Sequence, residues 1–156
     1  IINALKKLKM PVFAIAPNSD AGNNVIFEEL KKFSRNNPSV RVFPSLSRSD
    51  YLGLLKICNL LIGNSSSGII EASYLNIPVV NIGLRQKNRE LGKEIISVDK
   101  ISQQSINNAI RKATTKKMKK NKSNQLYGVG NASNQIIRIL EHVKITDKLM
   151  QKQIRY

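Results

Sequence analysis

The sequence predicts an α/β fold in which a parallel sheet carries helices on both faces. Short apolar runs alternate with amphipathic stretches along the chain, with about one helix between successive runs. This alternation is typical of βαβ units, whose right-handed crossovers place helices on both sides of the sheet. The 156 residues, 41% of them hydrophobic, are enough for one domain with a buried core. We therefore expect a single domain over residues 1–156.

Five short segments are predicted to be strands. The first is a compact apolar run that stops at Pro17, and the second alternates apolar and polar side chains. The fourth begins with Pro78, which a strand tolerates at its first position. The five predicted strands are residues 11–16, 40–43, 59–63, 78–82 and 94–98.

Amphipathic segments follow the strands and are predicted to be helices. The first places Ile26, Leu30 and Phe33 at helical spacing, and either Asp20 or Asn23 can cap its start. The predicted helices are residues 23–35, 47–58, 67–75, 102–112 and 132–143.

The last predicted helix carries an apolar stripe of Ile136, Ile137 and Leu140. Such a stripe is most often part of a core. The alternative is a contact with another domain, in which case this chain alone exposes an apolar patch and self-associates as a homo-oligomer.

The charge balance is strongly basic. Lys and Arg number 26 against 10 Asp and Glu, so the formal net charge is +16. An anionic partner such as nucleic acid is the usual interpretation. However, many of the cations lie in one tract over residues 111–122, which contains no Phe or Tyr to stack on bases. We interpret this tract as a solvated helix end and loop, and a basic nucleic-acid-binding module as the less favoured alternative.

Composition argues against several classes of protein. No apolar run approaches the ~20 residues that cross a bilayer, and the N-terminal segment lacks the apolar core of a signal peptide. We therefore expect a cytoplasmic chain with no membrane partner. With Cys58 and His142 as the one cysteine and the one histidine, neither a disulfide framework nor a Cys or His metal site is expected. The chain does not begin with Met, which suggests a piece of a longer protein.

The segment from Gly63 to Gly68, Gly-Asn-Ser-Ser-Ser-Gly, carries the strongest chemical signal. It lies between a predicted strand and a predicted helix, at the carboxyl edge of the sheet where such folds bind ligands. Glycines allow close approach, serines supply hydroxyl donors and a helix start supplies free N–H groups, which together favour phosphate. The segment lacks both the Walker loop and the dinucleotide fingerprint. The alternative is that its Ser and Asn residues only cap the helix.

Two charged residues follow this segment. Glu71 is placed in the predicted helix, where its carboxylate can accept hydrogen bonds from a pair of ribose hydroxyls. Arg85 follows the fourth predicted strand, and its guanidinium can hold a phosphate or carboxylate with two parallel hydrogen bonds. The alternative for each is an ordinary solvated side chain.

Four motifs occur in order along the chain. They are Pro-Asn-Ser-Asp-Ala-Gly at residues 17–22, Gly-Asn-Ser-Ser-Ser-Gly-Ile-Ile-Glu at 63–71, Ile-Pro-Val-Val-Asn-Ile-Gly at 77–83 and Arg-Gln-Lys-Asn-Arg at 85–89. Together they resemble the hydrolysing UDP-N-acetylglucosamine 2-epimerases, mainly over residues 11–92. The resemblance implies one half of a GT-B-type fold with two Rossmann-like domains. It also implies release of UDP with formation of N-acetylmannosamine, or a related 2-acetamido sugar, for sialic-acid-type pathways.

The resemblance implies roles for individual residues, all of them in substrate binding. They are Ser65 and Ser66 for the diphosphate, Glu71 for the ribose hydroxyls, Arg85 for the UDP part, Asn18 at the cleft, and the backbone near Leu46 for uracil. The family's catalytic carboxylates and a functional His belong to an N-terminal domain with no counterpart in this sequence. No catalytic residue is therefore expected in this chain, and we expect no epimerase activity from it alone. No metal, nicotinamide or other cofactor is implied, and the implied partners are a UDP-sugar and the N-terminal domain.

Asn76 and Asn88 depart from the resemblance, because Gly is common at both positions. Asn adopts left-handed backbone angles more readily than most residues with a side chain. We therefore expect both turns to keep a left-handed backbone.

A second enzyme class shares the main features of the site. The nucleotide-binding half of a GT-B glycosyltransferase also has a phosphate site at a helix start and a ribose-binding Glu. It transfers the sugar to an acceptor, so the product separates the two functions.

Overall fold

The computed structural model describes residues 1–8, 10–17, 22–115 and 126–151. Contacts divide the chain into two compact units, Ile1–Leu126 and Tyr127–Tyr156, and each unit is described by itself. The single domain expected over residues 1–156 stays a prediction.

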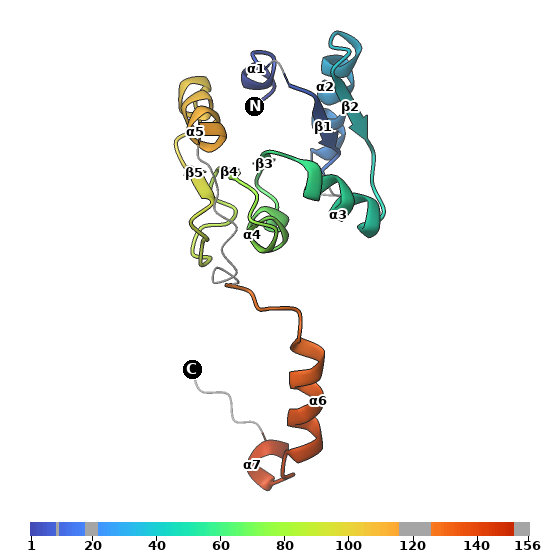
Figure 1. The fold of residues 1–156 in the computed structure, drawn as a ribbon, viewed down its shortest axis with the longest axis vertical. Helices are drawn as coiled ribbons and strands as arrows, with labels where there is room; N and C mark the ends of the chain where they lie inside the picture. The colour runs from blue at the N-terminus through green and yellow to red at the C-terminus, as the bar shows by residue number, and fades with distance from the viewer. Residues whose placement is uncertain (9, 18–21, 116–125, 152–156) are drawn as a thin grey trace. The chain divides into compact units, whose positions relative to one another are not determined.

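Strands and helices alternate along most of the N-terminal unit, from α1 in blue to α5 in orange, and a loop without a helix joins β4 to β5 (Figure 1). Every predicted strand is confirmed, with ends that differ from the prediction by no more than two residues. In chain order the elements are α1 (Ile2–Leu5), β1 (Val12–Ile15), α2 (Asn23–Arg35), β2 (Val40–Phe43), α3 (Arg48–Ile57), β3 (Leu61–Gly63), η1 (Ser66–Gly68), α4 (Glu71–Tyr74), β4 (Val79–Ile82), β5 (Ile95–Val98) and α5 (Gln103–Thr115).

Each strand pair is parallel, as predicted. β1 pairs with β2, so that Val12 lies opposite Val40. β4 lies between β3 and β5, and its Val79 is opposite both Leu61 and Ile95. Within the described ranges no ladder joins β1 to β3, so the backbone hydrogen bonds form a two-stranded and a three-stranded sheet. The α/β class is confirmed, and the carboxyl ends of paired strands meet at one edge of each sheet.

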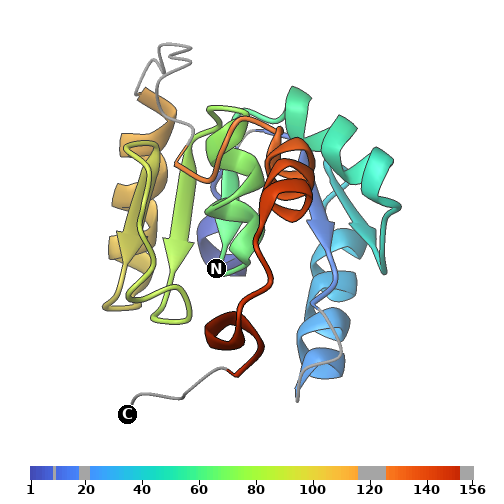
Figure 2. The same ribbon diagram turned by 90° about the horizontal axis from the view of Figure 1, so that it is seen from below.

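Helices cover both faces of the three-stranded sheet, as predicted (Figures 1 and 2). Successive side chains of a strand point to opposite faces, so Val79 and Val80 enter different apolar clusters. Ala4 of α1 and Ile106 of α5 pack with Val80, whereas Leu55 of α3 packs in the cluster of Val79. All four residues of β4 are buried, which makes this strand the centre of the core.

The helix predicted over residues 67–75 is wrong in its first half. Ser66–Gly68 form a 3₁₀ turn, labelled η1, and α4 starts only at Glu71. Gly68 lies directly against the sheet, because a Cβ atom there would stand 3.1 Å from Cγ1 of Val79. The N–H groups of Gly68 and Ile69 form the tighter i→i+3 hydrogen bonds of a 3₁₀ turn, to the carbonyls of Ser65 and Ser66.

Helix α2 also begins differently from the prediction. Its N-cap is Gly22, which has a φ of 83°, and no described side chain caps it. Asn23 is the first helical residue, so the prediction that Asn23 caps this helix is wrong. Glycine takes the cap position because it adopts left-handed backbone without steric cost. Asp20, the other predicted cap, lies outside the described residues.

Both predicted left-handed turns are confirmed. The backbone φ is 56° at Asn76 and 70° at Asn88. Asn76 follows Leu75, the C-cap of α4, at the position where a left-handed residue commonly ends a helix.

Replacing Asn76 by valine is expected to lower the free energy of unfolding by about 1–2 kcal/mol, because a β-branched residue is strained in left-handed backbone. Asn76→Gly should change it by less than about 1 kcal/mol, because glycine adopts this backbone freely. Urea unfolding followed by circular dichroism measures both. Asn108→Val, at an exposed position of α5, is the control, since Asn and Val have similar helix propensities. An equal loss in both valine variants would show that strain at residue 76 is not the cause.

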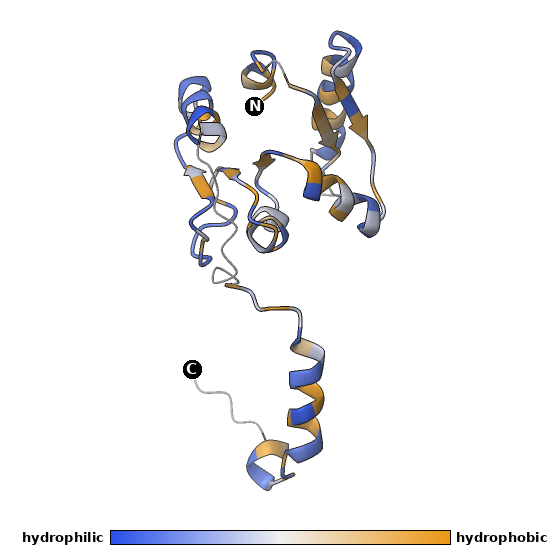
Figure 3. Ribbon diagram, viewed as in Figure 1, coloured by the Kyte–Doolittle hydropathy of each residue, from blue (hydrophilic) through white to orange (hydrophobic). Residues whose placement is uncertain are grey.

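The C-terminal unit contains α6 (Ala132–His142) and α7 (Asp147–Met150). Within this unit, described by itself, the stripe of α6 is not covered. Ile136, Ile137 and Leu140 are 55%, 51% and 67% exposed, and Figure 3 shows hydrophobic residues in orange along this helix. The prediction that the stripe belongs to a core stays a prediction.

The basic tract begins in α5, which continues to Thr115. Arg111 and Lys112 are exposed near its end, in agreement with a solvated helix end. Residues 116–122 of the tract lie outside the described residues. No helix in the described ranges is both long and apolar enough to cross a bilayer.

Candidate functional site

The segment Asn64–Ser67, here called the serine loop, follows β3 at the carboxyl edge of its sheet. Ser65 and Ser66 are exposed, whereas Gly68 and Ile69 just beyond the loop are buried. The Ser65 hydroxyl accepts a hydrogen bond from the backbone N–H of Ser67 at 3.3 Å. Ser65 therefore caps the 3₁₀ turn, as the capping alternative predicts, while its exposed oxygen stays accessible to a ligand.

The short α4 changes how this loop can hold an anion. A helix of four residues has too few aligned peptide groups for a strong macrodipole. The positive potential expected from a longer helix is therefore small. The groups at this edge that can donate to an anion are instead the serine hydroxyls and the local N–H groups.

Two side chains from other elements bind the serine loop. The Tyr51 hydroxyl on α3 forms a 2.5 Å hydrogen bond with the hydroxyl of Ser67. Nε2 of Gln86, in the turn after β4, donates to the backbone carbonyl of Asn64 at 2.8 Å. These two residues were missed by sequence reasoning. Tyr51 carries only the signal of an apolar helix face, and Gln86 carries only its place beside Arg85.

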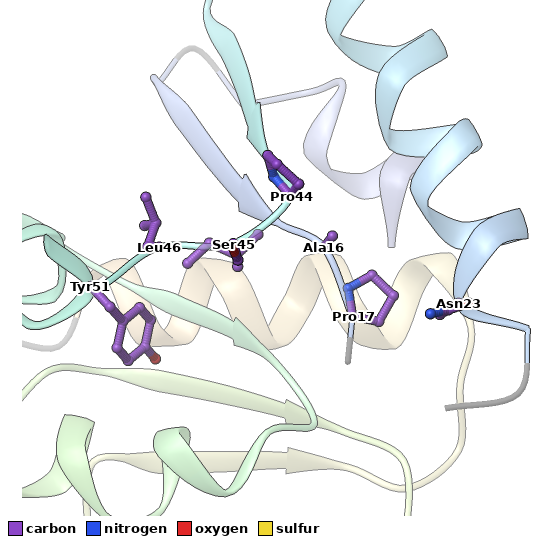
Figure 4. Close-up of a pocket in the computed structure, with 8 residues that line it drawn as sticks. Ala16, Pro17, Asn23, Pro44, Ser45, Leu46 and Tyr51 are labelled. Atoms are coloured by element: carbon purple, nitrogen blue, oxygen red, sulfur yellow. The ribbon is translucent and has the colours of Figure 1, made fainter. Parts of the chain in front are cut away.

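A pocket of about 340 Å³ lies at the carboxyl ends of β1 and β2 (Figure 4). Its lining residues come from the ends of both strands and from the starts of α2 and α3. They are Ile15, Ala16, Pro17, Asn23, Pro44, Ser45, Leu46 and Tyr51. Leu46, predicted as a site residue, is among them. Tyr51 lines the pocket and also binds Ser67, so one side chain joins the pocket to the serine loop.

The negative charge of Glu71 acts on Tyr51. Burial of the Tyr51 ring raises the pKa of the Tyr51 hydroxyl, the hydrogen bond with Ser67 opposes this rise, and the charge of Glu71 adds to it. Glu71 is half-buried at the first position of α4.

The remaining predicted site residues are Arg85 and Asn18. Arg85 is exposed, two residues beyond Gly83, whose φ of 83° turns the chain at the end of β4. Asn18 lies outside the described residues. No group of three or more His, Cys, Asp or Glu side chains that could hold a metal ion occurs among the residues described.

Comparison with known proteins gives one consistent result for this chain. A hydrolysing UDP-N,N'-diacetylbacillosamine 2-epimerase from Legionella pneumophila is 32% identical over 152 residues, 97% of this chain and 39% of the relative. A UDP-N-acetylglucosamine 2-epimerase from Neisseria meningitidis is 38% identical over 96 residues, 62% of this chain and 25% of the relative. This chain thus spans well under half the length of these relatives.

A solved structure supports the fold. The UDP-GlcNAc 2-epimerase of Methanocaldococcus jannaschii, crystallised in complex with UDP-GlcNAc and UDP, has a TM-score of 0.57 to this chain. The alignment is 16% identical and covers 91% of this chain and 48% of that one. The family model for UDP-N-acetylglucosamine 2-epimerase matches residues 1–141. The chain therefore belongs to the UDP-N-acetylglucosamine 2-epimerase family.

Proposed function

We propose that residues 1–156 are the UDP-sugar-binding domain, the C-terminal half, of a hydrolysing UDP-N-acetylglucosamine 2-epimerase. The whole enzyme converts UDP-N-acetylglucosamine, or a related UDP-2-acetamido sugar, to UDP and a sugar of the N-acetylmannosamine type for sialic-acid-type pathways. The family match and the hydrolysing relative from Legionella pneumophila support this function. They favour it over the glycosyltransferase alternative.

The observation that carries the proposal is the junction at Tyr51 between the pocket and the serine loop. A nucleoside diphosphate needs an enclosed surface for its base and hydroxyl or N–H donors for its phosphates. The pocket near Leu46 takes the uracil, and the exposed Ser65 and Ser66 hold the diphosphate. Glu71 accepts hydrogen bonds from the ribose hydroxyls between them.

Arg85 and Asn18 complete the proposed substrate site. The exposed Arg85 guanidinium contacts the UDP part from the turn after β4. Asn18 comes directly after Pro17, a lining residue of the pocket, in the sequence, and we assign it to the substrate site on the resemblance alone.

The chemistry divides between this chain and the rest of the enzyme. A base removes the C2 proton of the sugar, the C1–O bond breaks and its electron pair leaves with the β-phosphate of UDP. Water then adds across the C1=C2 bond of the resulting unsaturated sugar: its hydroxyl bonds to C1, and a proton is delivered to C2 on the face opposite to the one that lost its proton, which inverts C2. The serine loop and Arg85 stabilise the charge that develops on the departing diphosphate, and the base comes from the N-terminal domain.

Partners and location follow from this division. The partners are the UDP-sugar and the N-terminal domain, and the exposed stripe of α6 is available for self-association. We place the enzyme in the cytoplasm, where the free thiol of Cys58 stays reduced.

Replacing both Ser65 and Ser66 by alanine is expected to weaken UDP binding by ~1–3 kcal/mol, the range for lost hydrogen bonds to a charged group. Isothermal titration calorimetry of the 156-residue chain with UDP measures the change. Ser49→Ala on α3, which removes another exposed hydroxyl, is the control and should leave the Kd unchanged. A wild-type chain that does not bind UDP, or a double variant with unchanged Kd, would contradict the proposed site.

A further inference from the structure

We propose that Tyr51 and Gln86 are positioning residues that hold the serine loop in the conformation that binds diphosphate. This inference rests on the proposed function. It assigns to two residues outside the predicted substrate contacts the task of ordering those contacts before the ligand arrives. Such preorganisation reduces the conformational entropy that the loop loses when the ligand binds.

The hydrogen bonds from Gln86 and with Tyr51 are made at the two ends of the serine loop. Gln86 holds the carbonyl of Asn64, the first residue of the loop, and Tyr51 holds the hydroxyl of Ser67, the last. The exposed Ser65 and Ser66 lie between these anchors. Because the anchors come from α3 and from the turn after β4, the position of the loop is set by two separate elements.

Gln86 is as buried as a core residue, although its side chain is a polar amide. Its side chain is 4% exposed, and its Oε1 has no hydrogen-bond partner among the described residues. A carbonyl oxygen only accepts, so Nε2 must face Asn64, and this leaves Oε1 buried without a donor. A buried, unpaired acceptor costs stability. The residue is therefore better explained by what its nitrogen holds than by its packing.

Tyr51 connects the wall of the pocket to the serine loop. Its ring lines the pocket and its hydroxyl reaches Ser67. Figure 4 shows this ring at the end of the pocket next to Leu46. A phenylalanine at this position keeps the pocket wall but releases the loop.

The test uses Tyr51→Phe and Gln86→Met in the 156-residue chain, with UDP, inorganic pyrophosphate and uridine as ligands in NMR titrations. Loss of one neutral hydrogen bond corresponds to about a 3- to 10-fold change in an equilibrium constant. Each variant should therefore bind UDP and pyrophosphate about 3- to 10-fold more weakly. The affinity for uridine should stay within about twofold, because the pocket wall is kept.

Two further measurements distinguish positioning from general support of the fold. The amides of Gly68 and Ile69 donate within the 3₁₀ turn, and their hydrogen exchange should accelerate about 3- to 10-fold without ligand. The melting temperature of Gln86→Met should not fall, because methionine removes the unpaired buried acceptor. Gln103→Met on α5 is the matched control, since Gln103 also donates to a backbone carbonyl, that of Asn3.

Each outcome decides between the two proposals. If the wild-type chain binds UDP, and both variants bind UDP and pyrophosphate as tightly as the wild type does, the positioning role is overturned and the proposed function stands. If the variants lose uridine as strongly as pyrophosphate, the two residues support the whole fold and the positioning role is overturned as well. If the wild-type chain binds neither UDP nor pyrophosphate, the proposed function fails and takes the positioning role with it.

Discussion

Replacing Glu71 by alanine is expected to weaken UDP binding by about 10- to 100-fold, because hydrogen bonds to a charged acceptor contribute about 1.5–3 kcal/mol. Glu71 is half-buried in α4, and its charge acts on Tyr51 at the junction of the pocket and the serine loop. Isothermal titration calorimetry with UDP measures the loss. Glu71→Gln should lose most of the same affinity, because a neutral amide accepts more weakly than a carboxylate.

A change of ligand tests the assignment to the ribose. With 2',3'-dideoxy-UDP the wild type and Glu71→Ala should bind equally, because the ligand has no ribose hydroxyls to donate. Glu29→Ala on α2 is the control variant: Glu29 is exposed and paired with Lys32, and its removal changes the net charge by the same amount. A loss of equal size with the dideoxy ligand, or in Glu29→Ala, would show that Glu71 does not hold the ribose.

Replacing Leu55 by alanine is expected to lower the free energy of unfolding by about 2–5 kcal/mol. Leu55 is 2% exposed and packs with Ala72, Ile77 and Val79 between α3 and the three-stranded sheet. Removal of its side chain leaves a cavity that the surrounding helix and strand fill only in part. Because domains of this size are stable by about 5–15 kcal/mol, the loss is a large share of the total. Urea unfolding followed by circular dichroism measures it.

The same helix provides the matched control. Ile57 is two residues further along α3 and is 74% exposed, so Ile57→Ala should change the free energy of unfolding by no more than about 0.5 kcal/mol. Both substitutions shorten an apolar side chain to alanine in one helix and differ mainly in burial. Similar losses in the two variants would mean that α3 does not pack on the sheet through Leu55.

Local sequence determined the strands and most of the helices. Short, mostly apolar runs such as Val79–Ile82 form strands whose residues are all buried, as expected for a parallel sheet covered on both faces. The left-handed turns at Asn76 and Asn88 also followed from local chemistry, since Asn tolerates positive φ better than most residues with a side chain. The sequence motifs identified the family, and the family model matches residues 1–141.

Tertiary contacts decided what local patterns could not. The helix expected from residue 67 begins as a 3₁₀ turn, where Gly68 lies close to Val79 of the sheet, and the local pattern does not relate these two segments. The stripe of α6 has the periodicity of a core helix, yet periodicity does not say whether another surface covers it. Tyr51 and Gln86 reach the serine loop from 16 and 22 residues away, and no local pattern relates residues that far apart. Sequence therefore determined which segments form the sheet and the loop, whereas long-range packing decided how the loop is held, because that depends on side chains from separate elements meeting in space.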